Sequence, residues 1–240
     1  MPLGLVGFDR RELGEALSLV GVDEAGRGCL VGPVVAAAVR CSSEFYASSW
    51  CRRNSRQVDD SKRLPPARRA EIVERFKYAC SQDWIQIGIG VASVEEIERY
   101  NIYHANGLAM RRALDLVAGE ASSSLWDSPV DGSRPPVVII DGRPIRNFAV
   151  THRAIVKGDR KSLAIALAGI HAKEHRDAIM RQLDLLHPRY GFGRHKGYGT
   201  AEHMEALRRH GPCPEHRPSF LHKVMGESPD KPSATQDSLF

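Results

Sequence analysis

Two adjacent acidic residues, Asp23 and Glu24, follow an apolar run and precede a glycine-rich turn, Gly26-Arg27-Gly28. The run before them, residues 19–22, is typical of a buried strand. Neighbouring residues on a strand point to opposite faces, so the two acids cannot share one core. They fit where a strand ends and polar groups gather, beside glycines that let a ligand approach closely. The motif therefore predicts a sheet with a site at its strand ends.

Two later segments repeat this pattern. The apolar run 137–140 ends in Asp141, and an expected strand over Arg153–Val156 leads to Asp159. Carboxylates gathered in this way repel one another unless cations lie between them. Mg²⁺ and Mn²⁺ prefer such oxygen ligands, and two ions can stabilise both the attacking and the leaving oxygen of a phosphodiester. A single Asp more often caps a turn, but four acids at strand ends favour a two-metal site.

The remaining pattern alternates strands with helices, which predicts an α/β layered domain. Besides the strands that end near Asp141 and Asp159, strands are expected over 19–23, 30–39 and 84–91. Residues 41–56 are polar and are expected to be irregular. Pro65-Pro66 begins a helix, and Ser93 with Glu96 forms a capping box for a short one. Other helices are expected over 8–17, 103–117, 161–186 and 200–209. Residues 119–136 read as a surface loop, and the residues after Met225 as a flexible tail.

Composition narrows the class of protein. The chain has 240 residues, enough for one full core, and no apolar run long enough to cross a bilayer. Its N-terminus lacks the pattern of a secretory signal. Five cysteines without CxxC spacing indicate reduced thiols in the cytoplasm. His171 and His175 do not form an HExxH motif, so they predict a polar helix face rather than a zinc pair.

Charge is distributed unevenly. Residues 1–142 have 17 Lys/Arg and 19 Asp/Glu, whereas 143–223 have 16 and 7, and 224–240 have 1 and 3. The three regions thus carry −2, +9 and −2. A basic region beside a carboxylate cluster suits a polyanionic substrate met through metal ions, which favours nucleic acid over a merely solvated surface.

Several motifs together resemble the ribonuclease HII family, the bacterial type 2 ribonucleases H. They occur in the family's order from about Leu19 to Phe220: GVDEAGRGCLVGPVVAAAV (21–39), DDSKRL (59–64), YNIYHANGLAMRRAL (100–114), IIDG (139–142), VKGDRKSLAIA (156–166), HKGYGT (195–200) and HRPSF (216–220). The resemblance implies an RNase H-like three-layer fold with a five-stranded mixed sheet flanked by helices. It implies one catalytic domain over 1–223, with a helical part over about 186–223, followed by the tail 224–240. Fewer than twenty residues precede the first strand, which argues against the sibling ribonuclease HIII.

The resemblance also implies an activity and its residues. The activity is endonucleolytic hydrolysis of RNA in RNA–DNA hybrids, including lone ribonucleotides in duplex DNA, leaving 5′-phosphate and 3′-hydroxyl ends. The metal-binding acids fall on Asp23, Glu24, Asp141 and Asp159, with Mn²⁺ or Mg²⁺ as two divalent ions. Asp177 is a rival for the fourth position, but it lies within an expected helix and is interpreted as structural.

Substrate recognition is implied at two places. The backbone of Gly26, Arg27 and Gly28 reads the 2′-hydroxyl, and Tyr198 stacks on the sugar at the RNA-to-DNA junction. Without the resemblance, Arg27 could equally be a salt-bridge partner and Tyr198 a loop residue. Four basic positions match family positions near the substrate and are either phosphate contacts or ordinary surface charges: Lys62, Lys157, Lys196 and Arg217.

The chain departs from the family in places. Gly169 replaces the serine of a common AAAS segment, which removes any side-chain hydrogen bond made there, and GYGT replaces GYPT or GYAT. The terminus Gln236-Asp237-Ser238-Leu239-Phe240 resembles the QL[SD]LF pentapeptide that docks to the bacterial sliding clamp, with Gln236, Leu239 and Phe240 as contacts. The expected protein is a monomer acting in DNA replication and ribonucleotide repair. The competing hypotheses are an inactive hybrid-binding module and a structure-specific DNA nuclease.

Overall fold

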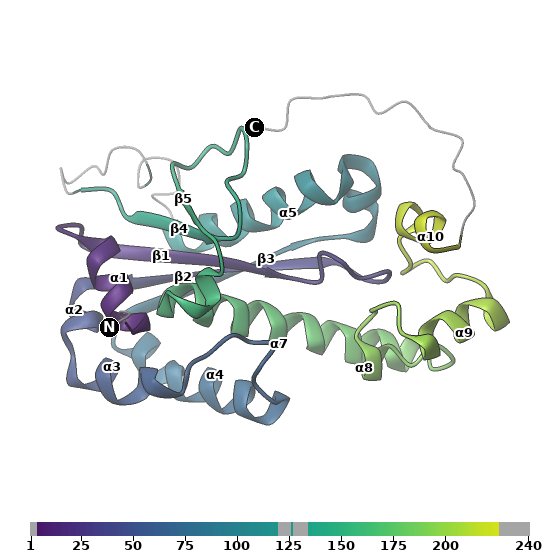
Figure 1. Cartoon of the computed structure of the whole chain (residues 1–240), viewed down its shortest axis with the longest axis horizontal. Coiled ribbons are helices and arrows are strands. Elements are labelled where there is room, and N and C mark those ends of the chain that lie inside the picture. The colour runs from purple at the N-terminus through teal and green to yellow at the C-terminus, as the bar shows by residue number, and fades with distance from the viewer. Residues whose placement is uncertain (1–3, 120–125, 127–133, 226–240) are drawn as a thin grey trace.

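A five-stranded mixed sheet forms the centre of the computed structural model, which describes residues 4–119, 126 and 134–225 (Figure 1). The strand order is β3-β2-β1-β4-β5. The strands β1, β2 and β3 are antiparallel neighbours, whereas β4 pairs parallel with both β1 and β5. Their bounds are β1 Ser18–Ala25, β2 Val34–Ser42, β3 Ile85–Ala92, β4 Val137–Asp141 and β5 Arg153–Ile155.

The register of the parallel strands brings the predicted acids to one edge. Val22 of β1 lies opposite Ile140 of β4, so the next residues along each strand are Asp23 and Asp141. Asp141 lies opposite Ile155 of β5. Three residues after Ile155, the short 3₁₀ helix η3 (Gly158–Arg160) begins and carries Asp159. The carboxyl ends of β1, β4 and β5 therefore meet, as the sequence predicts.

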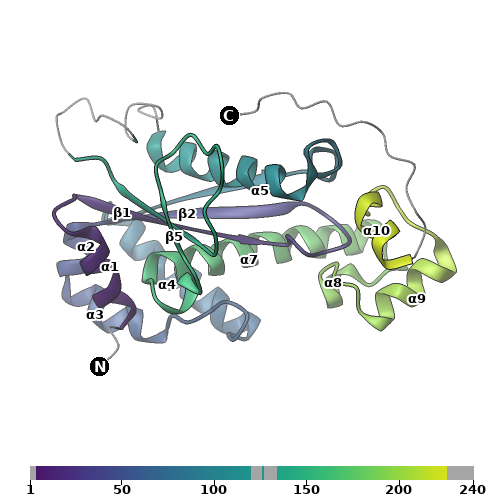
Figure 2. The ribbon, with the colours of Figure 1, turned by 45° about the horizontal axis from the view of Figure 1, so that its top comes forward.

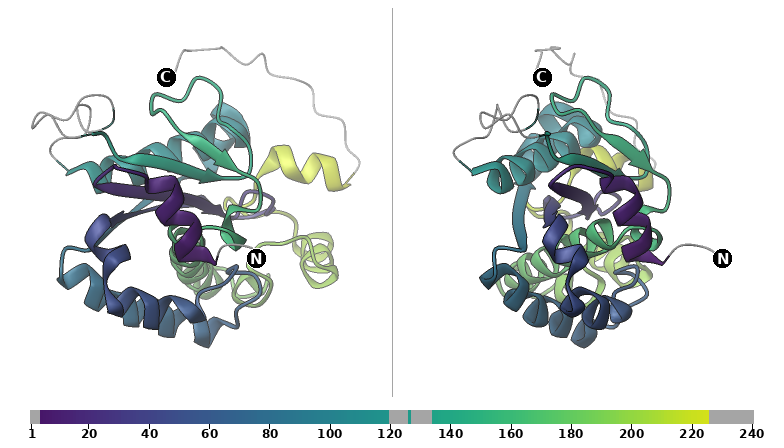
Figure 3. Two further views of the ribbon diagram at one scale, coloured as in Figure 1. Left: turned by 60° about the vertical axis from the view of Figure 1, so that its left-hand side comes forward. Right: turned by 90° about the vertical axis from the view of Figure 1, so that its left-hand side faces the viewer.

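Helices cover both faces of the sheet and give three layers (Figure 3). One face packs against α5 (Val94–Ala118), and the other packs against α7 (Leu163–Leu186). Residues that alternate along β1 enter the two cores in turn, with Leu19 facing α7 and Val20 facing α5. Among the helices that join α7 on this side are α1 (Leu5–Leu13) and α4 (Pro66–Ser81).

A helical lobe lies beyond one end of the sheet (Figure 2). It consists of α8 (Phe192–His195), α9 (Ala201–His210) and α10 (Pro218–Met225). A separate cluster that includes Val31, Met180 and Phe192 joins the lobe to α7 and to the segment after β1. An isolated bridge between Val31 and His216 ties the same parts together. The lobe thus confirms the helical C-terminal part and stands next to the acidic edge.

Three expectations about local structure need correction. Residues 41–56 are not irregular, because Ser42 and Ser48 cap α2 (Ser43–Ala47) and α3 (Ser49–Asn54) with their hydroxyls. The short helix after Ser93 and the helix expected over 103–117 are merged in α5, with a kink at Asn101. The second strand begins at Val34 rather than Leu30. Most of the loop 119–136 and all of 226–240 lie outside the described residues.

Among the described residues, no helix is both long and apolar enough to cross a membrane.

Asp9 links α1 to the start of α7 and is fully buried. Its Oδ2 accepts hydrogen bonds from the Tyr46 hydroxyl and the Ala164 amide, each at 2.9 Å. Burial raises the pKa of Asp9 to about 6 against the opposing effect of these bonds. Its charged form is therefore disfavoured in the folded state.

Asp9→Asn should remove a pH dependence of stability. A pKa raised on folding stabilises the fold below the unfolded value near 4, and this contribution is lost as pH rises through 6. The free energy of unfolding of the variant, relative to the unsubstituted chain, should therefore increase by up to about 3 kcal/mol between pH 4 and pH 7. Urea unfolding at both pH values measures it, and a difference independent of pH would contradict the assignment.

Candidate active site

Asp23 and Asp141 lie side by side at the ends of β1 and β4, and backbone amides fix both carboxylates. The Glu24 amide donates to Asp23 Oδ1 at 2.7 Å, and the Gly158 amide donates to Asp141 Oδ1 at 2.6 Å. The second bond ties β4 to the turn before Asp159. The carboxylate of Asp141 thereby helps to place the next acid of the predicted site.

Asp23 and Glu24 lie on opposite faces of β1, as strand geometry requires. Asp23 points to α7, where a Cβ on Gly169 would be only 2.4 Å from its Oδ2. Glu24 points to α5, where Asn106 hydrogen-bonds its carboxylate. The two acids therefore approach the edge of the sheet from its two sides.

Burial and mutual repulsion make Asp23, Glu24 and Asp159 difficult to ionise. Burial raises the pKa of Asp23 well above its ordinary value, and the charges of Glu24 and Asp141 raise it further. The pKa of Glu24 is raised by burial and by Asp141, although Arg27 opposes the shift. Burial and then Asp141 raise the pKa of Asp159. The cluster thus has the electrostatic character of a cation site.

Lys62 is the cation that several of these acids share. Its partial burial lowers the pKa of the ammonium group, but Asp23, Asp60 and Asp159 outweigh this effect and raise the pKa. Tyr198 also contributes to this shift. Lys62 therefore interacts electrostatically both with the acidic edge of the sheet and with Tyr198 of the helical lobe.

The donor set of the acidic edge fits a hard divalent cation, because all of its ligands would be carboxylate oxygens. Within 4–119, 126 and 134–225, no three His, Cys, Asp or Glu side chains already form a group able to hold a metal. The acids fit such an ion by chemistry and charge, and not as a preformed cage.

A cleft of about 900 Å³ opens beside Glu24 and Asp141. Three arginines line it together with Asn106: Arg27, Arg143 and Arg146. Cations next to carboxylates suit a substrate with several phosphates. Asn106, Arg143 and Arg146 are not among the site residues predicted from the sequence. Asn106 could have been found from the sequence, because it is a polar residue within the apolar stripe of α5.

The glycine-rich turn rests on two buried arginines that hold backbone carbonyls. Arg217 donates from Nε to Gly32 O at 2.8 Å and from Nη1 to Arg27 O at 3.2 Å. Its side chain is fully buried, so it does not meet a phosphate as the sequence suggested. It supports the turn instead. Arg176 holds Val31, Pro33 and Lys196 in the same way.

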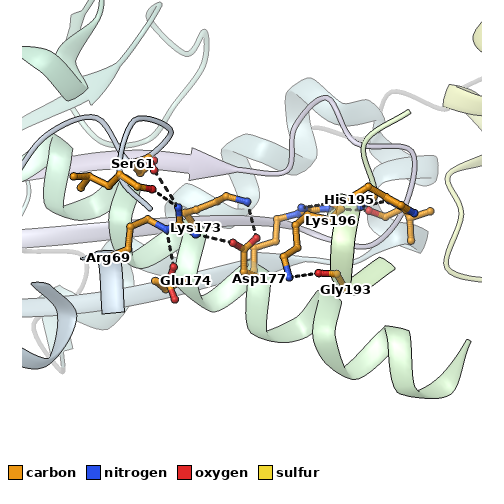
Figure 4. A network of polar contacts seen from close by, with 12 residues as sticks. Ser61, Arg69, Lys173, Glu174, Asp177, Gly193, His195 and Lys196 are labelled. Carbon is orange, nitrogen blue, oxygen red and sulfur yellow. Dashed lines mark hydrogen bonds and ion pairs between the residues drawn. The ribbon is translucent and has the colours of Figure 1, made fainter. Parts of the chain in front are cut away.

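The remaining predicted substrate residues differ in exposure. Arg27 and Lys157 are exposed, and Arg27 lies 3.6 Å from Glu24. Tyr198 is 42% exposed at the surface of the lobe. Lys196 is half-buried, and its Nζ donates to Gly193 O at 2.6 Å (Figure 4). Lys196 is therefore already engaged, whereas Lys157 and Tyr198 are open to a substrate.

Asp177 has the structural position expected for it. Its carboxylate pairs with Arg69 at 3.0 Å and with Lys173 at 2.6 Å inside the protein (Figure 4). Arg69 also binds Glu174 and the carbonyls of Ser61 and Leu64, on either side of Lys62 and Arg63. The network therefore braces the loop that carries Lys62. Since its partners are cations, Asp177 is unsuited to share a metal with the strand-end acids.

Gly169→Ala should impair the site more than the fold. The new Cβ would press on the Asp23 carboxylate, whose end can rotate away, while alanine favours the helix by about 1 kcal/mol. We expect an unchanged or higher melting temperature and a rate of the chemical step at least about tenfold lower. Gly169→Ser should recover part of the rate, because its hydroxyl can donate to the displaced carboxylate. Equal rates for all three proteins would contradict this view of Gly169.

Comparison with known families gives one consistent result. The model of the family described as Ribonuclease HII matches residues 20–224. A ribonuclease HII of Chlamydia pneumoniae is 42% identical, over 91% of this chain and 90% of that protein. One of Paramagnetospirillum magneticum is 45% identical, over 83% and 88%.

Solved structures agree at the level of the fold. The ribonuclease H2 of Pyrococcus horikoshii matches with a TM-score of 0.60 and 20% identity, over 87% of this chain and 97% of that one. The complex of PCNA with RNase HII from Archaeoglobus fulgidus matches with 0.56 and 21%, over 88% and 89%. Bst-RNase HIII in complex with Mn²⁺ matches with 0.56 and 18%, over 85% and 73%.

Proposed function

Since the chain belongs to the ribonuclease HII family, we propose that it is an endoribonuclease acting on the RNA strand of RNA–DNA hybrids and at single ribonucleotides in duplex DNA. The products are 5′-phosphate and 3′-hydroxyl ends, and the role is ribonucleotide and primer removal in DNA replication and repair. The observation that carries the assignment is the register that sets Asp23 beside Asp141. That pair lies between an arginine-lined cleft and the loop of Tyr198.

The four acids Asp23, Glu24, Asp141 and Asp159 are proposed as the ligands of two divalent ions, Mg²⁺ or Mn²⁺. When bound, these ions supply Lewis acidity to the attacking and the leaving oxygen of the phosphodiester. The acids hold them, and the Gly158 amide keeps Asp141 in place. Lys62 compensates charge at the same edge and is positioned to meet the scissile phosphate.

Recognition of the ribonucleotide is proposed at the turn 26–28 and at Tyr198. Arg217 and the Cys29 amide engage the Arg27 and Gly26 carbonyls, so the amides of the turn are the proposed donors to a 2′-hydroxyl. The exposed ring of Tyr198 offers a face for stacking on the sugar beyond the ribonucleotide. Lys157 and the cleft arginines are proposed phosphate contacts, and Lys196 contributes only if its bond to Gly193 opens.

One assay tests the function. The protein is incubated with Mg²⁺ or Mn²⁺ and three duplexes of equal sequence: all DNA, DNA with one ribonucleotide, and an RNA–DNA hybrid. We expect incision of the second and third only. Binding without incision would support an inactive hybrid-binding module, and cutting of the all-DNA duplex would support a DNA nuclease.

The C-terminal pentapeptide is proposed to bind the sliding clamp through Gln236, Leu239 and Phe240. It lies outside the described residues, and support comes from its sequence and from the archaeal PCNA complex among the structural matches. Deletion of 236–240 should abolish clamp binding without changing incision of free substrate. We further propose that the protein acts in the cytoplasm as a monomer, in keeping with its five unpaired cysteines.

A further inference from the structure

Three histidines are packed together in the helical lobe, and the proposed chemistry uses none of them. His195, His203 and His216 are 8%, 0% and 2% exposed. The rings of His195 and His203 are stacked with centroids 4.4 Å apart, and His203 Nε2 lies 3.1 Å from His216 Nε2. Imidazoles buried this closely need a defined arrangement of protons.

The hydrogen bonds determine that arrangement. His203 Nδ1 lies 2.9 Å from the carbonyl oxygen of Tyr198, which can only accept, so Nδ1 carries the proton. Its Nε2 is then an acceptor, and the proton between the two rings belongs to His216 Nε2. His216 Nδ1 is left to accept from the Cys213 amide at 2.9 Å, its shortest contact, while the Cys213 carbonyl oxygen and Sγ lie farther away at 3.2 Å.

Both rings are held in their neutral forms. Burial lowers the pKa of His216 to about 4, with His203 as the next contributor, and burial also lowers the pKa of His203. A second proton on His203 would set two N–H groups against each other. The neutral chain is therefore the form that fits the fold.

The chain of histidines ends on the loop that presents Tyr198. His195 Nε2 donates to Tyr190 O at 2.8 Å, so its Nδ1 accepts from the Gly197 amide at 3.2 Å. The Gly197 carbonyl in turn accepts from the Leu30 amide, just beyond the turn 26–28. The Gly197 amide and the Tyr198 carbonyl are thus both held by histidines of the lobe.

We propose that His203, held by His216, is a positioning residue that fixes the Tyr198 backbone so that its ring meets the sugar next to the ribonucleotide. This inference rests on the proposed function, in which Tyr198 stacks on substrate. A loop that is already ordered in the free protein loses little conformational freedom when the substrate binds. The histidines therefore lower KM rather than raise kcat. They touch no reacting atom.

Two substitutions test the roles of the two ring nitrogens of His203 separately. In His203→Asn the side-chain amide takes the place of Nδ1 and still donates to Tyr198 O. In His203→Gln the amide reaches the place of Nε2 and loses the bond to Tyr198. We expect KM for the duplex with one ribonucleotide to rise about tenfold in His203→Gln and less than threefold in His203→Asn, with kcat within about twofold in both. His210→Gln, at the exposed end of the same helix, should match the unsubstituted chain.

A double-mutant cycle distinguishes positioning from general loosening of the lobe. In a Tyr198→Ala background, His203→Gln should have no further effect on KM. An undiminished effect there, or equal KM values for the Asn and Gln variants, would overturn the proposal while leaving the nuclease function intact.

Imidazole ¹⁵N NMR gives a readout independent of turnover. It should show His203 protonated at Nδ1 and His216 at Nε2 at neutral pH, and the opposite tautomers would overturn the proposal. A protein that shows these tautomers but incises no duplex would instead refute the proposed function. In that case the positioning role of His203 is tested by the Gly197 and Tyr198 amide signals. Broadening of these signals in His203→Gln but not in His203→Asn would support it, and equal signals in the two variants would overturn it.

Discussion

Asp141→Asn should reduce the rate of incision at a single ribonucleotide at least about a thousandfold without destabilising the protein. The amide retains an oxygen that can accept the Gly158 N–H, so the turn before Asp159 keeps its support. The variant loses one negative charge of the site. Because the charge of Asp141 raises the pKa of Asp23, Glu24 and Asp159, its removal relieves repulsion and stability should not fall.

Single-turnover incision at saturating metal measures the loss, and calorimetric titration of Mn²⁺ should show weaker binding in the same variant. Asp177→Asn is the matched control, since it is the other acid considered for the site. It should lose about 3 kcal/mol of stability by leaving Arg69 and Lys173 incompletely paired, while the folded protein still incises. The reverse pattern, an inactive Asp177→Asn and an active Asp141→Asn, would refute the assignment of the metal ligands.

Gly26→Ala should be the most damaging single change in the glycine-rich turn. Gly26 has φ +91°, where L-residues are strained, and a Cβ there would be 1.9 Å from Arg176 Nε. Arg176 cannot move aside, because it holds the carbonyls of Val31, Pro33 and Lys196. We expect a loss of about 3 kcal/mol or more in the free energy of unfolding. Incision should also fall more than tenfold, because Arg176 joins the turn to the segment before Tyr198.

Gly28→Ala is the control from the same turn. A Cβ at Gly28 meets nothing within 4 Å, and its φ is not in the left-handed region. Its stability should therefore stay within about 0.5 kcal/mol of the unsubstituted chain. Any rise in its KM then reports close approach of the substrate backbone. Chemical unfolding and steady-state kinetics on both variants decide the matter, and equal stability of the two would contradict the packing of Arg176 against Gly26.

The sheet and most helices could be predicted because their signals are local. Alternation in 85–89, the capping box of Ser93 and Glu96, and the prolines at the start of α4 each act within a few residues. The helices α2 and α3 were missed because their signal is two serine caps within a polar segment. The segment is mostly polar, so the sequence does not indicate that Phe45 and Cys51 are buried. Their burial is evident only in the packed core.

The acids of the site could be predicted from the sequence because they follow expected strands. Asp141 and Asp159 follow apolar runs, so parallel pairing with β1 is enough to bring them near Asp23. Arg217 shows where this reasoning stops. A basic residue in a family motif reads as a phosphate contact, but its burial and its bonds to Arg27 and Gly32 make it a support for the turn. Exposure of a long side chain depends on what the rest of the chain packs over it.

By itself, the sequence determined the family, the layered α/β class and the acids at the strand ends, because periodicity, caps and adjacent carboxylates are properties of short segments. Only the tertiary structure decided which face each acid occupies, that Gly169 leaves room for Asp23, and that Arg176 and His203 hold the turn and the Tyr198 loop. Apart from the bond between His203 and Tyr198, which lie five positions apart, those relations join residues tens to well over a hundred positions apart. They exist only after the sheet, α7 and the helical lobe have packed, because hydrogen bonds of buried side chains depend on distances that no local pattern records.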